Sequence, residues 1–146
     1  MSRAFVKEGD DRPERPPPRP ASDRTNYVTA RGLTLLREQL EAARAAGDER
    51  NVAYYEDRIA VAVPVDAHAG PPGTIAFGST VVARESGGAQ LRVRIVGEDE
   101  ADPRHGTIAW SSPYAQALAG HRAGDRVVVQ RPAGPAAIVV EAVETL

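Results

Sequence analysis

Apolar side chains over residues 29–63 recur at steps of three and four, which is the spacing of the buried face of an amphipathic helix. The pattern falls into two segments, with Leu33, Leu36, Leu40 and Ala43 in the first and Val52, Tyr55, Ile59 and Ala62 in the second. Thr29 is placed to cap the first helix, and Gly47 and Asp48 mark the break where the second begins. Because neither face can be buried alone, we expect a short antiparallel coiled-coil hairpin over residues 27–66, with arms on the order of 20–26 Å long.

Residues 75–146 instead alternate between apolar and polar positions, which is typical of strands with one buried face. Gly87-Gly88 is a turn signal between two such strands. Ser112 followed by Pro113 marks the start of a short helix. The pattern predicts an α+β domain, in which an antiparallel sheet of about five strands carries one short helix.

The first 26 residues show neither pattern. Five prolines fall between Pro13 and Pro20, interleaved with arginines, and proline holds the backbone near polyproline II while removing N–H donors. Six basic residues are nearly balanced by five acidic ones, so a basic arm that binds nucleic acid is not favoured. We therefore expect residues 1–26 to form a disordered tail.

Composition excludes several kinds of chemistry. The chain has 146 residues and a formal charge of −2, so no strong field draws it to nucleic acid or to an anionic membrane. It has no cysteine and only three scattered histidines, which excludes disulfides, thiol nucleophiles and zinc sites with Cys ligands. Its longest apolar run is far too short to span a bilayer, and its start lacks the apolar stretch of a signal peptide. We expect a cytoplasmic protein that contacts no membrane and needs no cofactor.

Four further features have structural explanations. The acidic stretch Glu98–Asp102 lacks the ligand spacing and the central glycine of a calcium loop, so we interpret it as a solvated turn and predict no metal site. Trp110 lies on an alternating strand, where a core position explains it better than a stacking platform. Asp48 and Glu49 lie at the predicted hairpin tip, where an N-cap and a helix N-terminus favour acidic groups. Capping likewise explains Ser112 better than nucleophilic catalysis does.

A series of motifs in the second half of the chain resembles one protein family. The motifs are, in order, Phe77-Gly78-Ser79-Thr80-Val81, Arg94-Ile95-Val96-Gly97-Glu98-Asp99-Glu100-Ala101-Asp102, Gly106-Thr107-Ile108, Ser111-Ser112-Pro113, Ala117-Leu118-Ala119-Gly120, Gly124-Asp125 and Arg131-Pro132-Ala133-Gly134. This series, over about half the chain, resembles the carboxy-terminal domain of the GreA/GreB transcript-cleavage factors. The resemblance implies an FKBP-like sheet domain that docks on bacterial RNA polymerase. It also implies a coiled coil that enters the secondary channel, where an acidic tip holds a second magnesium ion and promotes cleavage of backtracked RNA.

The predicted tip departs from the family pattern. The resemblance implies long arms and an Asp followed three residues later by a Glu, whereas the arms here are about half as long and Asn51 lies three residues after Asp48. Short arms resemble those of the Rnk type, a polymerase-binding member with a truncated coil, or of the anti-Gre type, which occupies the same site without stimulating cleavage. We therefore predict a monomeric regulator of elongation that is not an enzyme and approaches nucleic acid only within the elongation complex.

The family's contact region implies where the sheet domain docks, because Ser112-Pro113 matches the end of the family's contact loop. The implied polymerase-binding residues are Ser111, Ser112, Pro113 and Tyr114. Two other functions stay open. One is an active cleavage stimulator, in which Asp48 and Glu49 reach the polymerase centre. The other is a peptidyl-prolyl isomerase, which needs an aromatic-lined pocket that two phenylalanines and one tryptophan supply only thinly.

Overall fold

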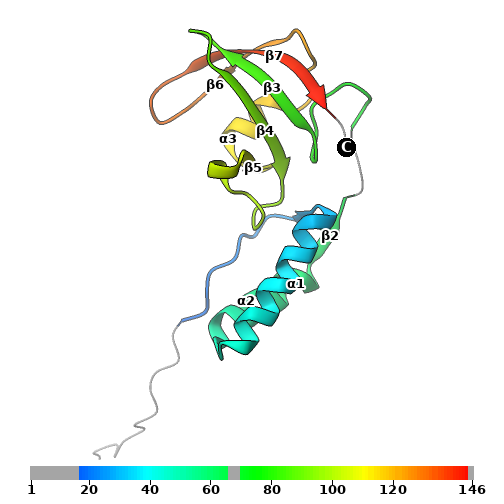
Figure 1. Cartoon of the computed structure of the whole chain (residues 1–146), viewed down its shortest axis with the longest axis vertical. Helices are drawn as coiled ribbons and strands as arrows, with labels where there is room; N and C mark the ends of the chain where they lie inside the picture. The colour runs from blue at the N-terminus through cyan, green and yellow to red at the C-terminus, as the bar shows by residue number, and fades with distance from the viewer. Residues whose placement is uncertain (1–16, 66–69, 145–146) are drawn as a thin grey trace, which may run out of the picture.

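The computed structural model describes residues 17–65 and 70–144, in which a helical hairpin precedes a domain built on a β-sheet (Figure 1). The elements, in chain order, are β1 (Asn26–Val28), α1 (Ala30–Ala45), α2 (Glu49–Ala60), β2 (Ala62–Pro64), β3 (Thr80–Glu85), β4 (Gln90–Val96), the 3₁₀ helix η1 (Pro103–His105), β5 (Thr107–Ala109), α3 (Pro113–Leu118), β6 (Arg126–Val129) and β7 (Ala136–Glu144). The α+β class predicted from the sequence is confirmed.

The helical hairpin forms where the spacing of apolar residues predicts it. Thr29 Oγ1 accepts a hydrogen bond from the Gly32 backbone N–H over 2.9 Å and so caps α1. The turn that follows passes through Gly47, whose φ of 66° suits glycine. Leu36 and Leu40 are buried on α1, and α1 packs against α2.

The second helix ends earlier than predicted. We expected its apolar face to continue to Ala62, but α2 stops at Ala60 and residues 62–64 form β2. Two causes act here, since β-branched valines favour strand and Pro64 drives the residue before it out of the helical region. β2 pairs in parallel with β1, so the two ends of the hairpin are joined by a two-stranded sheet that the pattern did not predict.

The five-stranded sheet has the order β5-β4-β3-β7-β6. The two predicted hairpins, β3–β4 and β6–β7, are antiparallel, as is the central pair β3–β7. The prediction of a wholly antiparallel sheet was wrong, because β5 runs parallel to β4. Residues 97–106, which include η1, carry the chain back to the starting end of β4, whereas a tight turn would have reversed it.

The core of the sheet domain lies between the sheet and α3 (Figure 1). The buried hydrophobic residues that form it are aliphatic, as the composition requires. They are Ile75, Val81, Ala83, Ile95, Ala115, Leu118, Val127, Val129, Ile138 and Val140. α3 contributes through its buried face, which fixes the position of the helix N-terminus described below.

The predicted tail differs from the structure at its end nearest the hairpin. Residues 1–16 lie outside the described residues, and residues 17–25 have no helix or strand. Asn26, however, is buried and begins β1, and Arg19 hydrogen-bonds to side chains on α2. In Figure 1 this segment runs beside the hairpin toward its tip. The segment from 17 to 26 is therefore held at Pro17, Arg19 and Asn26 by contacts that composition alone does not reveal.

Candidate functional site

The first candidate surface is the N-terminal end of α3. Ser112 Oγ accepts a hydrogen bond from the Ala115 backbone N–H over 3.2 Å, which confirms the predicted cap. Pro113 occupies the first helical position and is exposed, while Ser111 is half-buried. The sequence thus places a rigid, exposed proline directly after two serines, and the hydroxyl of Ser112 is already engaged in the helix cap.

Tyr114, the fourth residue predicted for this surface, is oriented differently. It packs against the core of the sheet domain, and its hydroxyl oxygen is buried without a hydrogen-bond partner among the described residues. Burial raises the pKa of Tyr114. Tyr114 therefore contributes by holding α3 on the sheet, and its hydroxyl is not presented on the surface.

The hairpin tip brings Asp48 and Glu49 together as the sequence predicts, but with unequal freedom. One carboxylate oxygen of Asp48 accepts the Asn51 backbone N–H over 3.1 Å, and the other accepts the Asn51 side-chain amide over 2.7 Å. Glu49 is exposed in the first turn of α2. Both oxygens of Asp48 thus accept hydrogen bonds from Asn51, one of them as the helix cap, and the side chain three residues after Asp48 is an amide.

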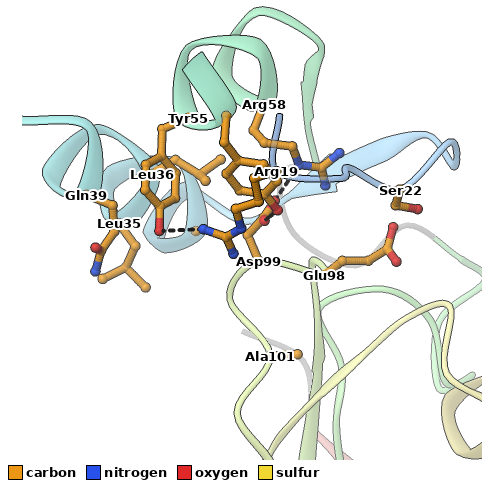
Figure 2. Close-up of a pocket in the computed structure, with 12 residues that line it drawn as sticks. Arg19, Ser22, Leu35, Leu36, Gln39, Tyr55, Arg58, Glu98, Asp99 and Ala101 are labelled. Atoms are coloured by element: carbon orange, nitrogen blue, oxygen red, sulfur yellow. Dashed lines mark hydrogen bonds and ion pairs between the residues drawn. The ribbon is translucent and has the colours of Figure 1, made fainter. Parts of the chain in front are cut away.

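The junction between hairpin and sheet domain contains a buried ion pair. Arg58 Nε lies 2.7 Å from Asp99 Oδ2, and the two side chains are only 3% and 14% exposed. A second guanidinium nitrogen of Arg58 donates to Asn26 Oδ1 over 2.7 Å, and Asn26 in turn donates to the Arg58 carbonyl. Figure 2 shows Arg58 and Asp99 pointing toward one another from α2 and from the loop after β4. The sheet domain is therefore anchored to the base of the hairpin.

Tyr54 joins the same junction by donating its hydroxyl to the second carboxylate oxygen of Asp99. Burial, together with this hydrogen bond to a carboxylate, raises the pKa of Tyr54 to about 12. The neutral phenol is the form that can donate, so the contact favours the protonated state.

A neighbouring carboxylate makes the second anchor. Glu100 has a side chain only 5% exposed and accepts a hydrogen bond from Thr29 Oγ1 over 2.6 Å. Gly97 approaches β1 so closely that a Cβ atom there would lie 2.5 Å from the Tyr27 carbonyl oxygen. The interpretation of Glu98–Asp102 as a solvated turn was therefore wrong, because Asp99 and Glu100 bind the hairpin. An acidic loop looks solvated in sequence when its cationic and hydroxyl partners are remote along the chain.

A cleft of about 490 Å³ lies where the tail segment, the hairpin and this loop meet. Its wall includes Arg19, Leu36, Tyr55, Arg58 and Asp99, and Figure 2 shows Arg19 reaching across it to Tyr55. Leu35 and Leu36 supply an apolar side. The cleft is thus already bridged by a side chain of the tail.

A separate pocket of about 360 Å³ lies beside α3 and is lined by Tyr27, Phe77 and Trp110. The Tyr27 ring meets Trp110 edge-on with centroids 5.1 Å apart. Trp110 also packs against the core, as predicted. The sequence supplies few aromatic residues for the pocket of a prolyl isomerase. Three of them line one pocket here, because β1 brings Tyr27 to the sheet domain.

Two absences concern only the described part of the chain. Within residues 17–65 and 70–144, no three His, Asp or Glu side chains come together as metal ligands would. None of the helices there has the length and apolar character that a membrane crossing needs.

The sheet domain matches a family model, and longer stretches of the chain align with named relatives. The family model for the carboxy-terminal domain of transcription elongation factor GreA/GreB matches residues 70–145. A protein from Alkalilimnicola ehrlichii named transcription elongation factor GreA is 33% identical over 141 residues, which cover 73% of this chain and 89% of that protein. A protein of the same name from Legionella pneumophila is 38% identical over 113 residues, covering 73% and 71%. A third, from an Anaeromyxobacter species, is 44% identical over 89 residues, covering 59% and 52%.

Solved structures give a related set. GreA factor homolog 1 of Thermus thermophilus aligns with 83% of this chain and 99% of its own, at 26% identity and a TM-score of 0.45. A prokaryotic elongation factor GreA/GreB from Nitrosomonas europaea aligns with 81% and 98%, at 22% identity and a TM-score of 0.44.

Proposed function

The chain belongs to the GreA/GreB family of transcription elongation factors, and on that premise we propose that it binds bacterial RNA polymerase near the secondary channel and regulates elongation without supplying catalytic groups. In this proposal it is a monomeric cytoplasmic protein of the Rnk-like or anti-Gre-like type, and it approaches nucleic acid only within the elongation complex. It is not itself an enzyme.

The state of the hairpin tip carries the proposal. Cleavage of the family type requires two tip acids that hold a magnesium ion, whereas here one oxygen of Asp48 caps α2, the other accepts from the Asn51 side chain, and Asn51 supplies an amide at the second position. These residues do not fit a magnesium site. Glu49 is exposed, but it directly follows Asp48 in the chain, whereas the family pattern has the second acid three residues after the first. Glu49 therefore does not replace the missing acid.

The length of the hairpin supports the same conclusion. α1 has 16 residues and α2 has 12, so the arms reach only about 24 Å and 18 Å at 1.5 Å per residue. The alignment with the Alkalilimnicola ehrlichii protein supports a short hairpin too. It is 141 positions long but includes only 73% of this 146-residue chain, so some of its positions are gaps in this chain. That relative therefore has residues with no counterpart here, and in this proposal they belong to a longer hairpin, so that the short tip of this chain stops before the polymerase centre.

The proposed docking site is the N-terminal end of α3, with Ser111, Ser112 and Pro113 at the surface and Tyr114 holding the helix on the sheet beneath them. Pro113 is its exposed member, held rigid by its ring and by the Ser112 cap. The Pro113→Glu variant tests the site, because it adds charge to the surface while keeping the cap and an acid favourable at a helix N-terminus. Gln116→Glu is the matched control, since Gln116 is also exposed on α3.

We expect Pro113→Glu to lower the affinity for core RNA polymerase at least about tenfold, the cost of about 1.4 kcal/mol of lost contact. Gln116→Glu should bind like the parent, and both variants should unfold at nearly the parent temperature. Binding of Pro113→Glu at parent affinity would remove this surface from the docking site.

RNA cleavage in a purified, backtracked elongation complex tests the regulatory role. We expect no acceleration when this protein is added alone, and we expect it to suppress cleavage by an added active GreA factor as its concentration rises. Acceleration by the protein alone, lost in the Asp48→Asn/Glu49→Gln double variant, would instead make it a cleavage stimulator. Binding without any suppression would contradict a shared site.

One observation favours a second candidate, the prolyl isomerase. The pocket lined by Tyr27, Phe77 and Trp110 is apolar and of a size that accepts a prolyl ring. A proline-peptide isomerisation assay decides this directly, and a rate equal to the uncatalysed one eliminates the activity.

A further inference from the structure

The tail segment is held on the hairpin by a well-formed arginine site. The Arg19 guanidinium carbon lies 3.8 Å from the centre of the Tyr54 ring, which is the geometry of a cation–π contact. One guanidinium nitrogen of Arg19 donates to Asn51 Oδ1 over 3.1 Å and to the Tyr55 hydroxyl over 3.3 Å. Three side chains of α2 therefore surround a single guanidinium.

A second contact holds the same segment at its N-terminal side. Arg50 Nε donates to the Pro17 carbonyl over 2.8 Å. The prolines around Arg19 limit the conformations that the free segment can adopt, so less entropy is lost when it settles on the helix. Contacts at residues 17 and 19 together place the segment along the outer side of α2.

The arginine site is connected to the hairpin tip. Asn51 accepts from Arg19 through its amide oxygen and donates to Asp48 through its amide nitrogen. The same residue therefore links the tail to one of the two tip carboxylates. A segment seated here covers α2 over the half of the hairpin that a partner entering tip first would meet.

We propose that residues 17–20 are a releasable strap, which closes on α2 through Arg19 and must leave before RNA polymerase can engage the tip half of the hairpin. The competition with polymerase rests on the proposed function, whereas the closed strap does not. All the strap contacts are partly exposed, and such contacts are individually weak. We therefore expect a closed form favoured only about tenfold over the open form, which a partner surface can displace.

The strap itself can be tested on the protein alone. Because the chain has no cysteine, an Ala21→Cys variant carries a spin label at one position, two residues after Arg19. We expect a mainly immobilised spectrum, which becomes mainly mobile when Arg19→Ala is added and stays immobilised when Arg24→Ala is added. Arg24 is the matched control, because it is an exposed arginine of the same segment. Equal mobility with and without Arg19→Ala would overturn the strap.

The competition is tested by affinity for core RNA polymerase. With the strap closed about nine-tenths of the time, releasing it should lower the apparent Kd about tenfold. We expect this for Arg19→Ala and an unchanged Kd for Arg24→Ala. Release of the label without any change in Kd would overturn the covering role. Absence of binding by the parent and by both variants would refute the proposed function and the competition with it, while the spectra still decide whether the strap exists.

Discussion

The ion pair between Arg58 and Asp99 gives the sharpest test of how the two parts of the chain are held together. Asp99→Asn keeps the size of the side chain and removes its charge, which leaves the Arg58 guanidinium buried with only neutral partners. Removing one partner of a buried pair costs about 3–5 kcal/mol. Because Asn26 still accepts one of the Arg58 hydrogen bonds, we place the loss of unfolding free energy at about 2–4 kcal/mol.

Glu141→Gln is the matched control, since it also removes a carboxylate from an arginine pair. Arg84 and Glu141 lie 2.8 Å apart, but their side chains are 47% and 34% exposed, so we expect a loss below about 1 kcal/mol. Urea unfolding followed by circular dichroism at 222 nm measures both variants. If Asp99→Asn loses no more stability than Glu141→Gln does, the pair is not an anchor and the argument from its burial fails.

Two further predictions concern the same junction. The pKa of Tyr54 is raised to about 12 from a usual value near 10, so the folded protein holds this proton more tightly than the unfolded chain does. The stability that the protonated phenol contributes is complete below about pH 10 and is lost as the pH rises to about 12. Absorbance titration of the parent should therefore show a late tyrosine component that Tyr54→Phe lacks, and an unchanged titration curve would contradict the assignment. Gly97→Ala should destabilise the protein by about 1–3 kcal/mol, because its Cβ would meet the Tyr27 carbonyl oxygen. The fluorescence of the single Trp110 reports whether β1 shifts, and an unaltered spectrum and stability would show that the backbone yields freely.

The elements that the sequence predicts well are those fixed by neighbouring residues. Thr29, Asp48 and Ser112 each cap the helix that follows, and in each case the hydrogen-bond partner lies three residues away. Glycine turns and alternating valines likewise act within a few residues and give the two β-hairpins. The prediction from local spacing failed at β2. The apolar spacing there continues that of the helix, but pairing with β1 stabilises a strand instead.

The junction could not be predicted in the same way, because its contacts join residues far apart in the chain. Arg58 and Asp99 are 41 positions apart, and Thr29 and Glu100 are 71 apart. With 18 basic and 20 acidic side chains in the sequence, charge complementarity permits hundreds of pairings and selects none of them. Only the folded arrangement of the hairpin beneath the sheet domain singles out these pairs.

The junction and the strap both involve one face of α2, which the sequence pattern did not single out. Asn51, Tyr54 and Arg58 follow one another at steps of three and four, so they form a second stripe on α2 beside the apolar one, to which Tyr55 belongs. Such a polar and aromatic stripe is ordinarily assigned to solvent. Here Arg58 binds Asp99 and Asn26, and Asn51 binds Arg19. Exposing the rings of Tyr54 and Tyr55 to water is unfavourable, because the rings are largely apolar. Two tyrosines next to polar residues on a helix therefore indicate a face that other segments of the chain cover, here Asp99 and Arg19.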